Sequence, residues 1–243
     1  MKIIKLDAID STNRFLKALS TEESCENFTV VTTELQTEGK GQRGSGWTSE
    51  TGKNLTFSVL YVQKIEQLMS LFTLNIVVAL SVVEALKTVS NLNFAIKWPN
   101  DILAENKKIA GILIENTFKN STEVQSVIGI GLNVNQSQFE NLPQASSLFL
   151  LENQLFDRDS LLISIVNRLE FNLNQLKNLN EDYFWGAYHS LLFKKDVVST
   201  FESASGNRFV GKIQKVTKEG KLEVLLEDDS VILFDVKEVK MLY

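Results

Sequence analysis

Residue types that build many familiar sites are scarce in this chain of 243 residues. It contains one cysteine, Cys25, and one histidine, His189. A single cysteine cannot form an internal disulfide, so we expect a fold that needs no oxidising compartment. A zinc site is disfavoured because it needs more of these side chains, and a cysteine–histidine nucleophilic site is disfavoured because His189 has no obvious acidic partner in the sequence. We interpret His189 as a structural residue of a helix and Cys25 as a loop or surface thiol.

Long apolar runs and a basic composition are absent as well. The most apolar stretch, residues 68–86, is interrupted by serine, threonine, asparagine and glutamate, which is typical of a core helix rather than a membrane span. Charged residues begin at Lys2, which disfavours an apolar signal peptide. A net charge of −5 argues against a general nucleic-acid binder. We therefore expect a cytoplasmic protein that binds neither membranes nor nucleic acid.

Hydrophobic periodicity predicts an α+β protein. We expect a short helix that begins at residue 11, and further helices at residues 68–89, 159–177 and 181–192. We expect strands at residues 3–9, 29–36, 55–62, 94–98, 107–115 and 124–134. The last two strands carry long apolar runs, which indicates central positions in a sheet.

From about residue 194 the pattern changes to short strands, separated by turn residues. These strands are expected at residues 196–201, 208–217, 222–226 and 231–234. Their spacing is typical of a small β-barrel. We therefore divide the chain into a large domain, residues 1–193, and a small domain, residues 194–243. A domain of about 50 residues is marginal on its own, so we expect it to lean on the larger one.

A glycine-rich loop follows the second predicted strand. Five of the twelve glycines lie between Gly39 and Gly52. Successive backbone N–H groups in such a loop can bind an anion, and Lys40 and Arg43 add positive charge. Trp47 offers a flat ring for stacking. The spacing is not that of a P-loop. A flexible surface loop and a ligand-binding loop therefore both remain open.

The segment Lys97-Trp98-Pro99-Asn100-Asp101 contains one of only two prolines. Pro99 favours a turn at the strand end, which leaves the side chains of Asn100 and Asp101 free to bind. An ordinary Asn-Asp turn is the alternative. Lys108 lies seven residues after Asp101, within a hairpin's reach of it. A carboxylate in that position could hold Mg²⁺ while the lysine contacts a phosphate.

Three glycines interrupt the predicted central strands: Gly111, Gly129 and Gly131. Glycine weakens a strand unless another group approaches the backbone closely. We suggest that these glycines, which lack side chains, leave an open surface on the strands where a ligand can lie, with Asn133 beside the ligand. Close packing of a helix on the sheet is the alternative explanation.

Five segments, in this order along the chain, resemble the catalytic domain of biotin protein ligases. They are Ser11-Thr12-Asn13, the loop from Glu34 to Trp47, Lys97–Asp101, Lys108–Glu115 and Gly129–Asn133. The resemblance covers roughly residues 3–190, and the tail resembles the SH3-like C-terminal domain of the family. It implies a class II synthetase-like mixed sheet with helices, plus a small SH3-like β-barrel.

The resemblance implies a two-step ligase reaction. Biotin and Mg²⁺–ATP give biotinyl-5′-AMP and pyrophosphate, and a lysine of an acceptor protein then displaces AMP. The implied acceptor is the biotin carboxyl carrier protein of a carboxylase such as acetyl-CoA carboxylase. Some family members carry an N-terminal DNA-binding domain, for which this chain leaves no room before Ile3. We expect no DNA binding, and a monomer or weak homodimer.

The resemblance also implies roles for individual residues. The expected catalytic residues are Lys40, Asp101 and Lys108, with Asp101 as the expected Mg²⁺ ligand. The expected ATP-binding residues are Trp47, Lys97, Asn100, Gly131 and Asn133. The expected biotin-binding residues are Ser11, Thr12, Asn13, Gln36, Gly39, Lys40, Gly41, Gln42, Lys108 and Gly111.

Within these sets the resemblance gives more specific contacts. Ser11, Thr12 and Gln36 would hydrogen-bond the ureido ring. Lys108 would contact the biotin carboxylate and the α-phosphate, while Trp47 and Asn133 would flank the adenine. The family loop commonly reads Gly-Arg-Gly-Arg, whereas here lysine and glutamine replace the two arginines at positions 40 and 42. Lysine lacks the bidentate fork of arginine, so we expect weaker loop closure over the intermediate.

Two other functions stay open from the sequence. A lipoate or octanoate–protein ligase shares the fold, although the Lys97–Asp101 segment favours biotin. A non-catalytic biotin-binding module is the second alternative, against which the presence of Asp101 and Lys108 argues.

Overall fold

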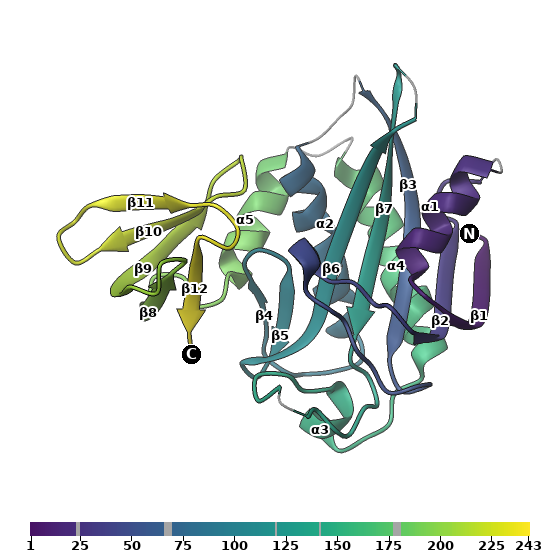
Figure 1. Cartoon of the computed structure of the whole chain (residues 1–243), viewed down its shortest axis with the longest axis horizontal. Coiled ribbons are helices and arrows are strands. Elements are labelled where there is room, and N and C mark those ends of the chain that lie inside the picture. Colours follow the sequence, from purple (N-terminus) through teal and green to yellow (C-terminus); the bar gives the residue numbers. More distant parts are fainter. Residues whose placement is uncertain (23–24, 66–69, 120, 141, 177–180) are drawn as a thin grey trace.

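Within the described residues of the computed structural model (1–22, 25–65, 70–119, 121–140, 142–176 and 181–243), the larger part of the chain forms a seven-stranded sheet with strand order β1-β2-β3-β7-β6-β5-β4. Figure 1 shows this sheet at the centre of the molecule. The strands are β1 (Ile3–Ile9), β2 (Val30–Gln36), β3 (Leu55–Lys64), β4 (Phe94–Lys97), β5 (Asp101–Ala104), β6 (Lys107–Phe118) and β7 (Glu123–Leu132). β1 and β2 pair in parallel, whereas the other neighbours pair antiparallel. The predicted mixed sheet is therefore confirmed, with β7 and β6 inside it.

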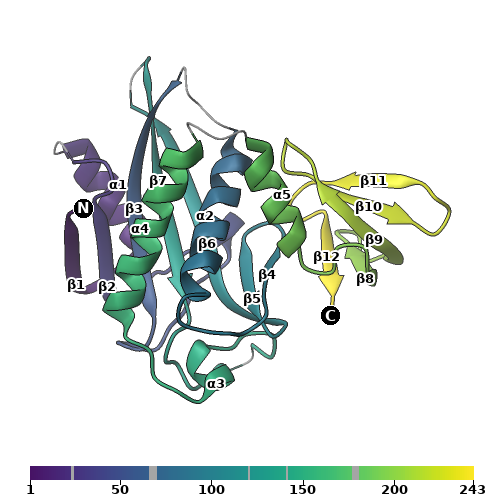
Figure 2. The ribbon, with the colours of Figure 1, turned by 180° about the vertical axis from the view of Figure 1, so that it is seen from behind.

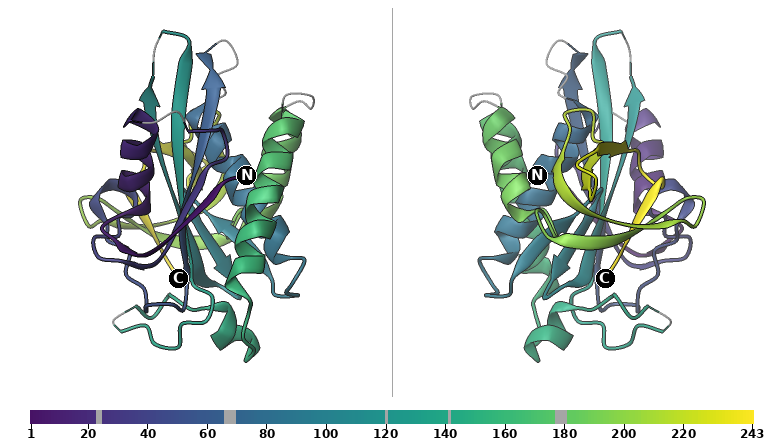
Figure 3. Two further views of the ribbon diagram at one scale, coloured as in Figure 1. Left: turned by 90° about the vertical axis from the view of Figure 1, so that its right-hand side faces the viewer. Right: turned by 90° about the vertical axis from the view of Figure 1, so that its left-hand side faces the viewer.

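Helices cover both faces of this sheet. The helices are α1 (Thr12–Glu22), α2 (Leu71–Leu86), α3 (Leu148–Glu152), α4 (Arg158–Leu176) and α5 (Glu181–Leu191), of which the short α3 lies below the sheet in Figure 1. α2, α4 and α5 lie on one face, and α1 lies on the other (Figures 2 and 3). Successive side chains of β3 accordingly enter different clusters. Val59 packs in the cluster that contains α2 and α4, while Leu60 packs with Leu16 of α1.

The tail forms a second, antiparallel sheet with strand order β11-β10-β9-β8-β12. Its strands are β8 (Val198–Ser203), β9 (Arg208–Val216), β10 (Leu222–Leu226), β11 (Val231–Phe234) and β12 (Val239–Leu242). Gly206, Gly220 and Asp229 have positive φ in the turns that the sequence predicts. The division of the chain between residues 193 and 194 stays a prediction.

The C-terminal sheet packs directly against the larger part, as expected. The indole N–H of Trp98 donates to the carbonyl oxygen of Gly220 over 2.9 Å, and the ring of Phe72 packs against the same glycine. On the neighbouring helix α5, His189 Nε2 lies 3.1 Å from the backbone nitrogen of Val216. His189 therefore serves the packing of the two sheets, and burial lowers its pKa.

Most predicted elements are present, with shifted ends. The predicted helix at 68–89 begins at Leu71, and residues 68 and 69 lie outside the described residues. Lys177, the predicted end of α4, also lies outside them. β5, β12 and α3 are additional elements that the periodicity did not predict. None of the helices in the described segments is long and apolar enough to cross a membrane.

Candidate functional site

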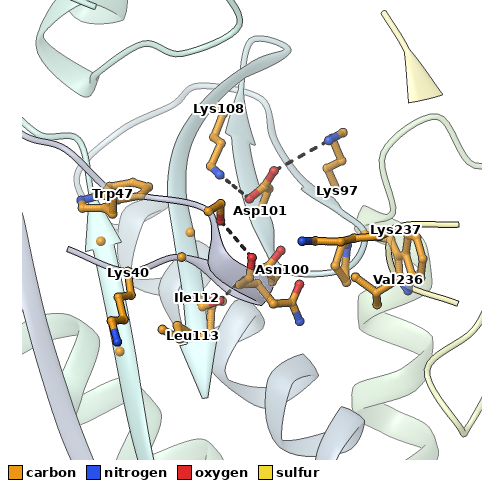
Figure 4. A pocket seen from close by; sticks show the side chains of 18 of the residues that line it. Lys40, Trp47, Lys97, Asn100, Asp101, Lys108, Ile112, Leu113, Val236 and Lys237 are labelled. Carbon is orange, nitrogen blue, oxygen red and sulfur yellow. Dashed lines mark hydrogen bonds and ion pairs between the residues drawn. The ribbon is translucent and has the colours of Figure 1, made fainter. Parts of the chain in front are cut away.

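A cavity of about 570 Å³ lies between the seven-stranded sheet, the glycine-rich loop and the C-terminal sheet. Figure 4 shows it from close by. The start of α1 and the end of β2 line one side, and the β4–β5 turn and β6 line another. Of the predicted site residues, those on the cavity wall are Ser11, Thr12, Asn13, Gln36, Lys40, Gly41, Gln42, Trp47, Lys97, Asn100, Asp101, Lys108, Gly111 and Gly131. Gly39 and Asn133 are not among the lining residues.

A polar group occupies the α1 side of the cavity. The backbone N–H of Thr12 donates to Gln36 Oε1 over 2.8 Å, and the Thr12 hydroxyl lies 3.0 Å from the same oxygen. Thr12 is only 3% exposed, so little bulk water competes for hydrogen bonds to its polar atoms. This end of the cavity can therefore hydrogen-bond a polar ring.

A cluster of charged side chains occupies the opposite side. Lys108 Nζ lies 2.7 Å from Asp101 Oδ1, and Lys97 Nζ lies 3.7 Å from Asp101 Oδ2. The side chain of Asp101 is 15% exposed, which keeps solvent screening of both ion pairs weak. Burial lowers the pKa of Lys97, and Asp101 opposes that shift. Two ammonium groups on one carboxylate leave an excess of positive charge for an anionic ligand.

The backbone aims Lys108 into this cluster. The β5–β6 register pairs Ile102 with Ala110 but Leu103 with Lys108, so β6 has one extra residue there, as at a β-bulge. The bulge brings the Lys108 side chain beside Gly111, although three positions separate the two residues. The Lys108 N–H also donates to the Gln144 carbonyl over 2.7 Å, which anchors this part of β6.

The glycine-rich loop folds back on itself beside the sheet. The Trp47 N–H donates to the Gly39 carbonyl over 2.9 Å, and Lys40 bridges to Gly46. Between them lies a short 3-10 helix, η1 (Gln42–Gly44). Gly39 is required by this fold, because a Cβ there would lie 2.2 Å from the Trp47 carbonyl oxygen. Lys40 itself is exposed at the cavity rim.

Protein side chains occupy the space above the three strand glycines. A Cβ on Gly131 would lie 2.4 Å from the Trp47 indole, and one on Gly111 would lie 3.3 Å from it. A Cβ on Gly129 would lie 2.4 Å from Asn13 Oδ1. The suggestion of an open surface for a ligand therefore needs correction: at Gly129 the close packing of α1 on the sheet explains the glycine. At the other two positions the indole of Trp47 forms the surface that a ligand would meet.

Two predicted ATP-binding asparagines have side chains engaged by the backbone. Asn100 Nδ2 donates to the Ile112 carbonyl over 2.7 Å, which ties the β4–β5 turn to β6. Asn133 Nδ2 donates to the Ser146 carbonyl over 3.0 Å, and the residue is 5% exposed. Asn100 still lines the cavity, whereas Asn133 holds the segment that anchors Lys108.

The C-terminal sheet adds a wall that the sequence reasoning missed. Lys237, Lys240 and Met241 line the cavity, and Lys240 contributes to the lowered pKa of Lys97. The ring centroid of Tyr243 lies 5.3 Å from Lys97 Nζ. Lys240 and Met241 belong to β12, which was not predicted. The cluster of lysines near the C-terminus was the only available signal.

The described residues contain no cluster of three or more histidine, cysteine, aspartate or glutamate side chains that could hold a metal ion. Both carboxylate oxygens of Asp101 already face ammonium groups. A resident metal at this carboxylate does not fit that arrangement well. Mg²⁺ that arrives on nucleotide phosphates needs few protein ligands and would fit beside it.

Comparisons with known proteins agree with this geometry. The Biotin/lipoate A/B protein ligase family model matches residues 6–133. The chain is 29% identical over 233 residues to the bifunctional ligase/repressor BirA of Escherichia coli, covering 93% of this chain and 70% of that protein. It is 31% identical over 173 residues to the biotin–[acetyl-CoA-carboxylase] ligase of Mycobacterium tuberculosis, covering 70% of this chain and 63% of that protein.

A solved structure extends the likeness over the whole chain. The biotin protein ligase from Aquifex aeolicus in complex with biotin and ATP superposes with a TM-score of 0.81 at 27% identity. The match covers 99% of this chain and 98% of that one, so it includes the C-terminal sheet. The family match spans more than half of the chain and contains both the Thr12–Gln36 pair and the Asp101–Lys108 pair. This protein belongs to the biotin/lipoate A/B protein ligase family.

Proposed function

We propose that this protein is an ATP-dependent ligase that activates biotin as biotinyl-5′-AMP and transfers it to a lysine of a biotin carboxyl carrier protein. The observation that carries the proposal is a single cavity with a polar end at Thr12–Gln36 and a cationic end at Lys97–Asp101–Lys108. The likeness to a ligase solved with biotin and ATP supports the same pairing of ligands.

In the first step, a carboxylate oxygen of biotin attacks the α-phosphorus of ATP, and the bond to pyrophosphate breaks. Both reactants are anionic, so positive charge must offset their repulsion. We propose that Lys108, held by Asp101, contacts both groups and that Mg²⁺ enters as part of the nucleotide substrate; the Asp101–Lys108 ion pair supports this role. Lys97 adds a second cation near the phosphates.

In the second step, the amine of the acceptor lysine attacks the acyl carbon of the mixed anhydride. The carbon–oxygen bond to AMP breaks, and the amine loses its proton. The loop that carries Lys40, Gln42 and Trp47 lines the cavity, which supports the proposal that it covers the anhydride and limits its hydrolysis. Because Lys40 and Gln42 supply one charge where two arginines are common, we propose that the intermediate is held less tightly than in relatives with both.

The two alternative functions have less support. A lipoate dithiolane ring offers no N–H or carbonyl group, so Thr12 and Gln36 would gain no hydrogen bond from that ligand. A pure binding module has no need for the half-buried Asp101–Lys108 ion pair in the cavity wall.

ATP–pyrophosphate exchange tests the proposal. Exchange that requires biotin, and that lipoate does not support, is the expected result. Exchange with lipoate alone would indicate the sister activity, and absence of exchange with either acid would indicate a binding module.

A further inference from the structure

A chain of buried hydrogen bonds runs behind the polar end of the cavity. It begins at Glu115 on β6, passes through Asn13 of α1 and Ser58 of β3, and ends at Thr12 and Gln36. Ser58 is fully buried, and Asn13 is 5% exposed. Glu115 and Ser58 do not line the cavity, so they can act on a ligand only through the residues that do.

The orientation of the Asn13 amide follows from its neighbours. Asn13 Nδ2 lies 2.8 Å from Glu115 Oε2 and 3.3 Å from the Leu113 carbonyl oxygen. Both of these atoms are acceptors, so the NH₂ group must face them. Asn13 Oδ1 therefore faces Ser58 Oγ, at 2.6 Å. Gly129 lets the amide lie this close to β7.

A count of hydroxyl protons then limits the direction of the remaining bonds. Asn13 Oδ1 can only accept, so Ser58 must use its single proton on that bond. Ser58 Oγ lies 2.8 Å from Thr12 Oγ1, and with its own proton committed it can only accept there. The Thr12 hydroxyl has two acceptors within reach, Ser58 Oγ at 2.8 Å and Gln36 Oε1 at 3.0 Å, and it can donate its single proton to only one of them. In either case that proton is committed within the protein, so Thr12 Oγ1 can only accept from a ligand N–H.

Gln36 is oriented in the opposite sense. Its Oε1 accepts the backbone N–H of Thr12, so the amide oxygen is turned toward α1. Gln36 Nε2 is turned instead toward the glycine-rich loop. A Cβ added to Gly39 of that loop would lie 3.0 Å from this nitrogen. This NH₂ group can donate to a ligand oxygen. The cavity end thus offers an acceptor at Thr12 beside a donor at Gln36.

We propose that Glu115 and Ser58 are positioning residues whose hydrogen bonds set this donor–acceptor polarity and make the site selective for a ring that presents an N–H next to a carbonyl, as a cyclic urea does. The inference rests on the proposed function, because the ureido ring of biotin has that pattern. The carboxylate at position 115 can only accept, so it holds the Asn13 NH₂ group toward itself. An amide there can donate to Asn13 Oδ1, which allows the Asn13 amide to turn over and the chain to reverse with loss of the 3.3 Å bond to the Leu113 carbonyl.

Two variants test the polarity independently. Glu115→Gln keeps the shape of the side chain but admits the reversed chain of bonds, and Ser58→Ala leaves Gln36 Oε1 as the remaining acceptor of the Thr12 proton, which turns the Thr12 lone pairs away from their present direction. Each should raise the KM for biotin about tenfold, the factor expected for one misdirected hydrogen bond, and leave the KM for ATP within about twofold. The ratio of kcat/KM for biotin to that for lipoate should fall by a similar factor.

Matched controls separate this effect from loss of structure. Ser126→Ala removes another fully buried serine, on β7, whose hydroxyl bonds Asn116 away from the cavity. Glu223→Gln neutralises a glutamate on β10 that pairs with Lys215. Both controls should keep the wild-type KM for biotin, and thermal melts of all variants report folding.

Two results would overturn the inference: a biotin KM within twofold of wild type in both test variants, or equal rises in the KM for biotin and ATP. A wild-type protein without biotin-dependent exchange would instead overturn the proposed function. In that case, calorimetric titration with biotin alone would test the roles of Glu115 and Ser58. Equal Kd values for wild type and variants, or no binding of biotin by the wild type, would reject these roles.

Discussion

Lys108 Nζ lies 2.7 Å from Asp101 Oδ1 across the β5–β6 hairpin, and the same carboxylate holds Lys97 on its other oxygen. One acidic side chain thus orients two cations at the end of the cavity opposite to Thr12 and Gln36. The arrangement separates recognition of a polar ring from neutralisation of anionic groups. Each part can therefore be tested alone.

Replacement of Lys108 by alanine should lower the rate of adenylate formation by about 10² or more, because a charge contact to the transition state is lost. Single-turnover pyrophosphate release measures this rate. Lys107→Ala is the matched control, since its ammonium group bonds the Pro143 carbonyl outside the cavity wall. A near-normal rate of pyrophosphate release by Lys108→Ala would show that Lys108 does not stabilise the transition state.

The pH dependence of ATP binding should reflect the loss of the positive charge of Lys97 at alkaline pH. Burial lowers its pKa below the ordinary 10.5, so it loses its charge at a lower pH than an exposed lysine. Between the two values the unfolded chain holds a proton that the folded protein lacks, and this site therefore makes stability rise with pH there. The KM for ATP should rise in the same window. Lys97→Arg should move that rise to higher pH, because arginine stays protonated; an unchanged profile would contradict the assignment.

Trp47→Ala should weaken ATP binding more than biotin binding, because the indole offers a stacking surface for a flat base. Its Nε1 is buried and has no hydrogen-bond partner in the described structure. Trp47→Phe keeps an aromatic face without the N–H and should lie between alanine and wild type. Calorimetry with each ligand gives the comparison, and equal losses for both would count against stacking.

Gly131→Ala should displace Trp47, because the new Cβ would lie 2.4 Å from the indole. The expected result is a weaker ATP affinity together with a lower Tm. Gly186→Ala in α5 is the control: nothing lies within 4 Å of the added Cβ, and the change should stabilise the helix by about 0.5–1 kcal/mol. A wild-type ATP affinity in Gly131→Ala would show that ATP binding does not depend on the present position of the Trp47 indole.

The sequence predicts well those features that depend on local spacing. The seven-residue interval between Asp101 and Lys108 predicts a pair across a hairpin, and the two residues form it. The turns at Gly206 and Gly220 need positive φ, which glycine supplies. The apolar runs of β6 and β7 indicate strands within the sheet, where both are found.

Features that depend on distant contacts were not predictable in this way. The side chain of Asn133 is turned to Ser146, and that of Asn13 to Glu115, by partners whose positions only the tertiary fold sets. β12 is four residues long and follows β11 closely, so it has too little periodicity to be recognised. The lysines that it brings to the cavity wall were missed with it.

Transfer of biotin to a carrier domain tests the two-step account most directly. Purified protein would be incubated with biotin, Mg²⁺–ATP and a biotin carboxyl carrier domain, and the products followed by intact mass and by nucleotide analysis. The account predicts a biotin amide on a single carrier lysine, with AMP and pyrophosphate released in equal amounts to it. Release of ADP and phosphate instead, or AMP formation without a modified lysine, would contradict it.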